Sequence, residues 1–356
     1  IYQQWVQTYP RDIVPRDNLA LRYHAIGQQD KALASSSEAM RIDPRDAFAF
    51  QNVADAYLRL NRFEEARAVA EKAVEQDIGS SVHFTLFELA SIRGDEAAQR
   101  QQLQWGAGKA FEPIMDWFQA RAECSRGKPQ AARADYAQSE SAAQRLGYKE
   151  FGGVILTDQA RCEAELGNLA EAKRGIAAAL SASKDRDTQT GVMQVLALTG
   201  DSARSQKIAD EMVRQDPTDT LLNKVFAPLA QAEGDLQHNQ PAQAVARLEV
   251  ARPYEWGSGP ASAGYLVNYL RAQAYLRLRD GAKAAAEYQQ ILDHRGTDPL
   301  DISYPLSRLG LARAYVLQGN VPAAKSAYQD FLAAWKDADP DVPVLKQAKT
   351  EYAKLQ

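Results

Sequence analysis

The sequence predicts an all-α fold built from repeated helical hairpins. The stretch "TYPRD" at residues 8–12 returns as "IDPRD" at residues 42–46, so Pro10 and Pro44 stand 34 residues apart. Runs of Val, Ile and Thr with a period of two, which would indicate strands, are nearly absent. At 356 residues the chain also exceeds the usual size of one globular core. This length favours several domains or an elongated array of repeats.

The first two repeat units match well beyond their prolines. Small residues at Ala20 and Ala54 allow two helices to approach closely, and tyrosines fill the adjoining space. Gly27 and Asn61 tolerate the left-handed backbone that ends the first helix of a hairpin. A proline then breaks the second helix and starts the next unit. The matched positions are Leu19, Ala20, Tyr23, Gly27, Ala32 and Ala39, which correspond to Val53, Ala54, Tyr57, Asn61, Ala66 and Ala73.

Seven weaker copies follow in the same frame, which gives nine full hairpins. Their predicted turns lie at Gly94, Gly127, Gly167 and Gly200, near Asn239, near Gly281 and at Gly319. The predicted division is residues 1–12 as the tail of a truncated upstream repeat, 13–217 as hairpins 1–6, 218–340 as hairpins 7–9 with longer loops, and 341–356 as a capping helix. Leu345, Ala348, Tyr352 and Leu355 recur at helical spacing in that last segment. Because the N-terminus starts inside a second helix, we expect the chain to be part of a longer protein.

Four stretches lengthen the spacing between turns: residues 146–153, 217–223, 253–264 and 293–305. We interpret them as longer interhelical loops in which a tyrosine or tryptophan pins an insertion to the hairpins. The alternative is that they line one rim and help to bind a partner. This alternative is strongest for residues 253–264, where Tyr254 and Trp256 coincide.

The 34-residue helix–turn–helix period, with its small residue, tyrosine, alanine and proline in fixed order, resembles the tetratricopeptide repeat. The resemblance covers nearly the whole chain. It implies a right-handed superhelical solenoid in which the first helices line a concave surface that binds proteins or peptides.

Longer phrases resemble a narrower group. "WVQTYPRD", "YLRLNRFEEARA", "LDHRG" and "FLAAWKDADPDVPVLKQAKTEYAKL" are similar to the C-terminal tetratricopeptide region of bacterial serine/threonine protein kinases of the acidobacterial type. Similar regions also follow winged-helix DNA-binding domains in bacterial regulators. The resemblance concerns the parent protein, because nothing kinase-like lies in these residues.

Composition and motifs exclude several classes of function. The net charge of −4 provides no basic field for nucleic acid or anionic lipid, and no apolar run approaches the ~18 residues of a membrane helix. His24, His83, His238 and His294 are far apart, and no metal-binding or nucleotide-binding motif occurs. Paired carboxylates such as Glu163 and Glu165 are interpreted as parts of solvated helix faces. We therefore predict no catalytic site, metal or cofactor.

The two cysteines, Cys124 and Cys162, fall on the first helices of consecutive hairpins. We expect two buried free thiols that pack as small hydrophobic groups. A disulfide is the alternative if the compartment is oxidising.

What remains is binding by the first helices. Trp117, Arg121 and Arg161 should form one patch, since aromatic and arginine side chains carry binding hot spots. The alternative is that these side chains pack on the neighbouring hairpin. Tetratricopeptide proteins that clamp chaperone C-termini carry a set of Lys, Asn and Arg residues on three consecutive first helices. The corresponding positions here hold Asp17, Leu21, Asn52, Ser81 and Thr85. Only Asn52 fits, so a chaperone clamp is disfavoured. The candidate groove residues are His24, Gln51, Asn52, Asp55, Arg59, Phe84, Glu88, Trp117, Arg121, Thr157, Arg161, Gln194, Tyr269, Gln273 and Arg313.

The sequence thus favours a non-enzymatic scaffold that binds a protein or peptide, as the C-terminal sensory or docking region of a larger bacterial signalling protein. One alternative is the regulatory part of a serine/threonine kinase. Another is an oligomerisation module that stacks two copies through the uncapped N-terminal edge. A cytoplasmic location and an extracytoplasmic domain of a membrane-anchored protein both stay open.

Overall fold

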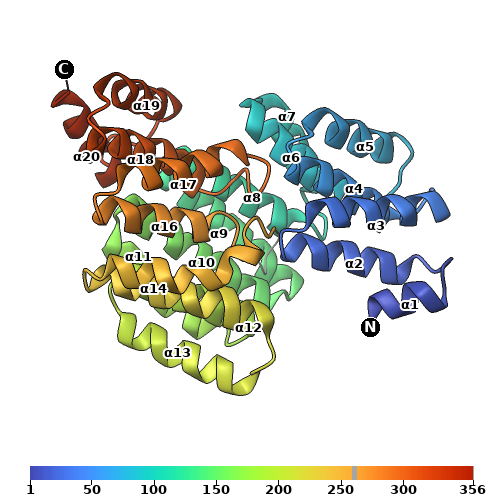
Figure 1. The fold of residues 1–356 in the computed structure, drawn as a ribbon. Coiled ribbons are helices and arrows are strands. Elements are labelled where there is room, and N and C mark those ends of the chain that lie inside the picture. The colour runs from blue at the N-terminus through green and yellow to red at the C-terminus, as the bar shows by residue number, and fades with distance from the viewer. Residues whose placement is uncertain (259–262, 356) are drawn as a thin grey trace. The chain divides into compact units, whose positions relative to one another are not determined.

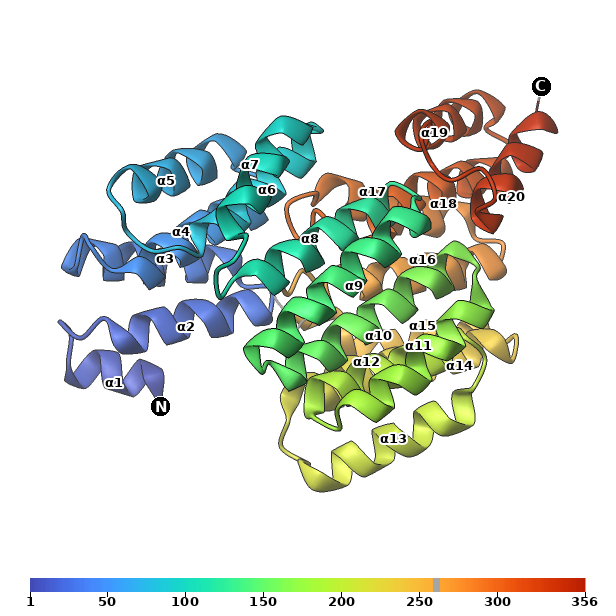
Figure 2. The same cartoon turned by 180° about the vertical axis from the view of Figure 1, so that it is seen from behind.

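The computed structural model describes residues 1–258 and 263–355, and all regular structure among them is helical (Figures 1 and 2). Packing divides the chain into two compact units. Unit 1 comprises residues 1–105, 253–264 and 294–299, and unit 2 comprises residues 106–252, 265–293 and 300–356. The predicted division into residues 1–12, 13–217, 218–340 and 341–356 was based on the spacing of the repeats and the length of the loops. The two units are instead defined by which parts of the chain pack together.

Unit 1 contains the first three hairpins. In the first two, the first helix packs against the second helix that follows it, and in the third His83 contacts Gln102 of the second helix. Asp46 caps the second of these hairpins, because its carboxylate accepts the backbone N–H of Ala49 at 2.8 Å. The helices are α1 (Tyr2–Thr8), α2 (Val14–Ala25), α3 (Gln29–Ile42), α4 (Ala47–Arg59), α5 (Phe63–Glu75), α6 (Val82–Arg93) and α7 (Glu96–Gly106), whose last residue belongs to unit 2.

Unit 2 contains six further hairpins and a final helix (Figures 1 and 2). Its α-helices are α8 (Glu112–Ser125), α9 (Pro129–Leu146), α10 (Lys149–Leu166), α11 (Leu169–Ala182), α12 (Arg186–Leu198), α13 (Ser202–Gln215), α14 (Ala227–Gln237), α15 (Pro241–Leu248), α16 (Leu266–Arg277), α17 (Gly281–Asp293), α18 (Ser303–Leu317), α19 (Val321–Ala334) and α20 (Pro343–Ala353). A π-helical turn, η1 (Leu222–Phe226), leads into α14, and a 3₁₀ turn, η2 (Glu249–Tyr254), leaves α15 and ends in unit 1.

The described residues therefore confirm the predicted all-α fold of nine hairpins with one helix after the last of them. Each hairpin turn holds one residue with a left-handed backbone. Eight of these residues were predicted as turn positions: Gly27, Asn61, Gly94, Gly127, Gly167, Gly200, Asn239 and Gly319. In the remaining turn, predicted near Gly281, the left-handed residue is Arg279 with a φ of 58°.

One predicted loop was wrong. Residues 146–153 form almost no loop, since only Gly147 and Tyr148 separate α9 from α10, and each of these helices has 18 residues. The extra residues lengthen the helices, and Gly153 lets α10 pass close to the start of α12. A Cβ atom at Gly153 would lie 2.1 Å from Thr188 Oγ1.

The other long stretches are partly irregular. Residues 217–223 run into η1, and α18 begins only at Ser303, so the last loop spans residues 294–302. Within the stretch 253–264, residues 259–262 lie outside the described part of the chain.

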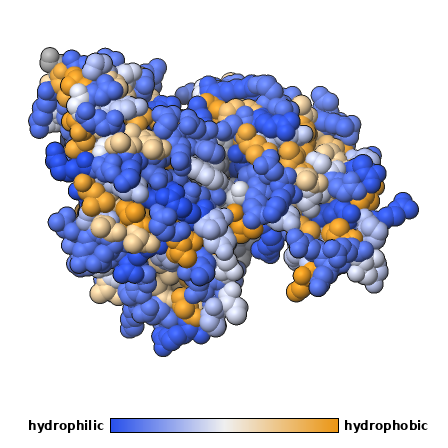
Figure 3. Space-filling model, viewed as in Figure 1, coloured by the Kyte–Doolittle hydropathy of each residue, from blue (hydrophilic) through white to orange (hydrophobic). Residues whose placement is uncertain are grey.

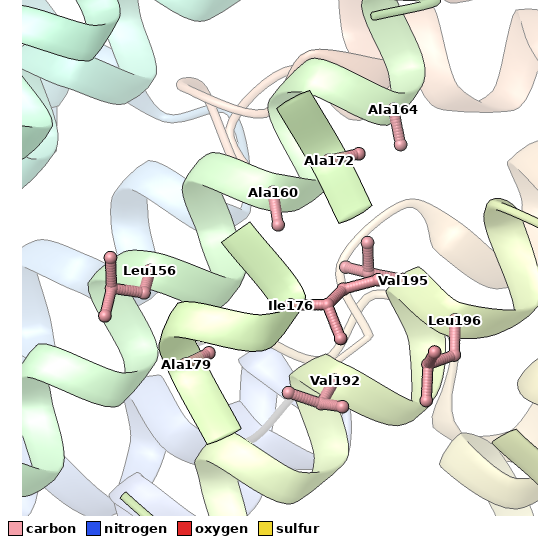
Figure 4. Close-up of a cluster of buried hydrophobic side chains, with 9 residues drawn as sticks. All are labelled: Leu156, Ala160, Ala164, Ala172, Ile176, Ala179, Val192, Val195 and Leu196. Carbon is pink, nitrogen blue, oxygen red and sulfur yellow. The ribbon is translucent and has the colours of Figure 1, made fainter. Parts of the chain in front are cut away.

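Small side chains bring the helices of unit 2 together. Ala160 on α10 is 1% exposed and faces Gly175 on α11, where a Cβ atom would lie 2.8 Å from that of Ala160. Figure 4 shows the surrounding cluster of α10, α11 and α12, which consists of Leu156, Ala160, Ala164, Ala172, Ile176, Ala179, Val192, Val195 and Leu196. Most of the outer face in Figure 3 is hydrophilic, and hydrophobic residues interrupt it in small groups. The apolar side chains of this cluster are thus buried between helices.

Unit 2 also contains contacts between its first and last hairpins. The buried Trp335, after α19, donates from Nε1 to the backbone oxygen of Ser125 at 2.9 Å, across 210 residues of sequence. The backbone N–H of Asp339 donates to the oxygen of Gly127 at 3.0 Å. Gly127 must lack a side chain, because a Cβ atom there would lie 2.9 Å from the Trp335 ring. The segment between α19 and α20 therefore packs on the turn between α8 and α9.

Candidate functional site

All fifteen predicted groove residues lie on first helices, and each is buried or half-buried. Seven belong to unit 1 and eight belong to unit 2. Each unit is described separately below, because the two groups have different surroundings.

In unit 1 the protein's own loops contact the predicted groove residues. The backbone N–H of Ser258 donates to the oxygen of His24 at 2.9 Å. Arg59 donates from Nη1 to the oxygen of Gly296 at 3.0 Å, and the N–H of Gly296 donates to Asn61 Oδ1 at 2.8 Å. No larger residue fits at Gly296, because a Cβ atom there would lie 1.8 Å from the backbone oxygen of Leu58.

These two loops also hold each other. The ring of Trp256 stacks on that of His294 with centroids 4.0 Å apart, and Gln29 donates from Nε2 to the backbone oxygen of Trp256 at 3.1 Å. The described part of the stretch 253–264 is thus held to α3 through the backbone of Trp256, and the Trp256 ring holds it to the loop that contains His294.

Buried charges in unit 1 are already paired. Arg59 donates to both carboxylate oxygens of Glu88 at 3.0 and 3.1 Å. Burial raises the pKa of Glu88 to about 7 even though Arg59 acts in the opposite direction. His24 faces Gln29 Oε1 at 2.6 Å through Nδ1, and burial lowers its pKa.

The other predicted residues of unit 1 are engaged as well. Asp55 accepts from Gln51 at 2.7 Å and from Thr85 at 2.6 Å, and Asn52 donates to the backbone oxygen of Asp17 at 3.5 Å. Phe84 is half-buried. The first helices of unit 1 therefore serve the internal structure of that unit.

In unit 2 the structure brings Trp117, Arg121 and Arg161 together around two carboxylates. Trp117 donates from Nε1 to Asp158 at 2.9 Å, and Arg121 lies over the Trp117 ring at 5.0 Å. Arg161 donates to both oxygens of Asp301 at 2.8 and 3.0 Å. These side chains hold α8, α10 and the start of α18 to one another. The fourth residue predicted in this region, Thr157, donates to the backbone oxygen of Val154 within its own helix.

The expectation of two free thiols was wrong. Cys124 on α8 and Cys162 on α10 form a disulfide, with Cα atoms 6.1 Å apart. The physical reason is that consecutive first helices pack side by side and place both sulfur atoms in one buried layer. The side chains are 3% and 4% exposed.

The remaining predicted residues surround a pocket, which we name the unit 2 pocket. Its larger lobe, with a volume of about 280 Å³, is lined by Glu165, Tyr269, Gln273, Leu276, Arg277, Tyr288, Leu306, Leu309, Gly310, Arg313 and Val344. A smaller lobe of about 50 Å³ shares Glu165, Tyr269 and Gln273 with it and adds Arg161, Gln194, Val195, Leu198, Leu229, Ala230, Glu233, Leu266 and Leu270. Five first helices, together with Tyr288 of α17 and Val344 at the start of α20, thus line the two lobes.

Most charged groups of this pocket have partners within the protein. Arg313 donates to both oxygens of Glu351 on α20, at 2.9 and 3.1 Å. Arg277 donates to the backbone oxygen of Leu236, and Glu233 accepts from Gln237 at 3.1 Å.

Glu165 differs from these groups, since no side chain or backbone group of the described residues donates a hydrogen bond to it. Its pKa is raised to about 7, mainly by burial and also by the charges of Glu233 and Asp301, while Arg161 acts in the opposite direction.

A family model for the tetratricopeptide repeat matches residues 49–77, which span α4 and α5. The second hairpin is thus similar to a tetratricopeptide repeat. Among curated protein sequences, none matches the chain significantly.

Several solved structures are similar to the chain over most of its length. Yeast Tom70 is 12% identical, with 99% of this chain and 90% of that chain covered and a TM-score of 0.43. A tetratricopeptide repeat protein from Parabacteroides merdae is 14% identical, with 88% and 98% covered and a TM-score of 0.41. The APC/C hetero-tetramer Cut9–Hcn1 is 13% identical, with 96% and 62% covered and a TM-score of 0.46.

Several residues that the sequence analysis named as groove candidates, such as Tyr269 and Arg313, line the unit 2 pocket. It misjudged Glu163 and Glu165 as solvated. Glu163 is 2% exposed and accepts two bonds from Arg133, at 2.6 and 2.9 Å. The available signal was the frame itself, because both residues lie on a first helix, and first helices form the inner layer of a hairpin array.

Within the described residues, no helix is long and apolar enough to cross a membrane. No group of three or more His, Cys, Asp or Glu side chains in that part of the chain could hold a metal ion.

Proposed function

We propose that the chain is a non-catalytic scaffold that binds a segment of another protein in the unit 2 pocket. The main support for this proposal is the larger lobe of the pocket, which has a volume of about 280 Å³ and is lined by residues of several first helices. Tetratricopeptide arrays bind their partners on surfaces made by these helices. The lining combines tyrosine, arginine and leucine side chains, and tyrosine and arginine are enriched among residues that dominate binding energy.

The unit 2 pocket is a better candidate than the first helices of unit 1. In unit 1, His24 and Arg59 already form hydrogen bonds with loops of the same chain. A ligand would have to compete with these loops for the same groups. In the pocket, by contrast, Gln273 and Tyr269 line open volume.

For the parent protein we propose a larger bacterial signalling protein in which this chain is the sensory or docking region. The support is the resemblance of the four quoted phrases to repeat regions that follow bacterial kinases. A kinase parent, which this region would regulate, is the more specific form of that proposal.

The disulfide supports a location for this region. Disulfides persist mainly in oxidising compartments and are rare in the cytosol. Because Cys124 and Cys162 are bridged, we propose that this region lies outside the cytoplasm.

Panning a phage-displayed library of random heptapeptides on the full chain tests this function. Selected peptides are then titrated by calorimetry against the full chain and against Gln273→Trp, which fills the space shared by both lobes. Binding should weaken at least tenfold in this variant. Gln243→Trp, at an exposed position of α15, is the matched control and should leave binding unchanged. Failure to select any peptide, or peptides that bind Gln273→Trp as well as the unmodified chain, would refute the assignment.

A further inference from the structure

Building on the proposed function, we propose that the ligand segment inserts an arginine or lysine side chain into the unit 2 pocket and that its charged end pairs with Glu165. Its methylene groups would lie against the rings and leucines of the larger lobe. This assigns a chemical class to the partner, namely a peptide with a basic anchor residue.

The first argument is charge. Of the ionisable groups around the pocket, Arg161 is neutralised by Asp301 and Arg313 is neutralised by Glu351. Arg277 also lies near Glu233, whose pKa it lowers against the effect of burial. Glu165 is the carboxylate left without a directed partner among the described residues, so a ligand that brings a positive charge completes the site.

The second argument is the cost of burial. Glu165 is half-buried, so its carboxylate has lost part of its hydration before any ligand arrives. An incoming guanidinium or ammonium group therefore gains a charge-assisted hydrogen bond in a low-dielectric setting, where such bonds are strong. An acidic side chain in the same position would place two carboxylates together, which is unfavourable.

The third argument is the shape and chemistry of the walls. Tyr269 and Tyr288 pack edge to face with ring centroids 6.0 Å apart, and both rings line the larger lobe. Aromatic faces attract cations, and leucines accept the aliphatic stem of arginine or lysine. A volume of about 280 Å³ is just below the range of drug-sized pockets, which suits one or two side chains of an extended segment.

Binding of such a peptide should depend on pH through Glu165. A cation binds its ionised form, so affinity should fall as the pH drops through about 7, the value to which burial raises its pKa. Burial also raises the pKa of both Tyr269 and Tyr288, which therefore stay neutral in this range. Several charged and titratable groups from neighbouring elements surround Glu165. They are Arg161 on its own helix, Glu233 on α14, Tyr269 and Arg277 on α16, Tyr288 on α17, Asp301 just before α18, and Arg313 on α18.

The decisive experiment uses the heptapeptides selected on the full chain. We expect a shared arginine or lysine, and replacing it by citrulline or norleucine should weaken binding to the unmodified protein about 10- to 100-fold. Glu165→Gln should cause a loss of the same size and should abolish the pH dependence between pH 5.5 and 8.5. Glu211→Gln, on an exposed face of α13, is the matched control and should change neither.

The outcomes separate this inference from the function on which it rests. If no peptide binds, the scaffold function itself fails. If peptides bind the pocket, as shown by their loss with Gln273→Trp, but carry an acidic or purely apolar anchor, the basic-anchor assignment is wrong and the scaffold stands. If Glu165→Gln does not fold, the comparison of arginine with citrulline on the unmodified protein still decides.

Discussion

Replacing Ala160 by glutamate tests whether the fifth hairpin packs as described. The side chain of Ala160 is 1% exposed, and α11 approaches it so closely that Gly175 has no room for a Cβ atom. A glutamate at this position must therefore either bury its carboxylate between α10 and α11 or push the two helices apart (Figure 4).

Both routes are costly. A buried charge without a partner costs about 3–5 kcal/mol, and overpacking a close helix contact costs about 1–3 kcal/mol. We expect Ala160→Glu to lower the free energy of unfolding of unit 2 by about 3–5 kcal/mol. The thermal midpoint should then fall by about 6–20 °C, measured by circular dichroism at 222 nm.

The control is Ala178→Glu, the same substitution at an exposed position of α11. It adds the same charge to the same hairpin without burial, so its cost should stay within about 0.5 kcal/mol. Equal midpoints for the two variants would show that Ala160 does not face α11, and the frame of this hairpin would have to be reassigned.

Four further expectations follow from particular contacts. Unreduced protein should show no reactive thiol, and replacing Cys124 and Cys162 by serine should lower the free energy of unfolding by about 2–4 kcal/mol, measured by urea denaturation. Arg279→Asn should raise it by about 0.5–1 kcal/mol in the same assay, because the left-handed backbone at this turn strains arginine more than asparagine. Trp335→Ala should cost about 3–5 kcal/mol, and an unchanged stability would mean that the contact with Ser125 is not formed. Glu351→Gln should weaken binding of a basic peptide several-fold by calorimetry, since it leaves an arginine of the pocket without its counter-charge; stronger binding would contradict the charge argument.

The repeat frame could be predicted from the sequence because its signals are local. A glycine or asparagine that ends a first helix, a small residue that allows close packing and a proline after the second helix all act within about one repeat. Arg279 escaped notice because arginine carries no preference for a left-handed backbone, and its turn was placed by the nearest glycine, Gly281.

The features that were missed depend on contacts between distant repeats. Trp335 meets the turn at Gly127 across five hairpins, and no periodic pattern encodes that pairing. The same holds for the loops that contact Arg59 in unit 1. Glu165 was judged from the arginines and lysines near it in sequence, whereas its surroundings come from α14, α16 and α18.

The final helix shows how such long-range packing shapes the candidate site. A capping helix is needed to cover the apolar edge of the last hairpin, and the buried Leu345 and Ala348 meet that need. Yet α20 does more than cover an edge, because Val344 lines the unit 2 pocket and Glu351 neutralises Arg313 on its wall. Without that carboxylate, Arg313 would offset the charge of Glu165 and the pocket would have no net preference for a cation. The preference for a basic ligand that we propose therefore depends on the helix that also completes the fold.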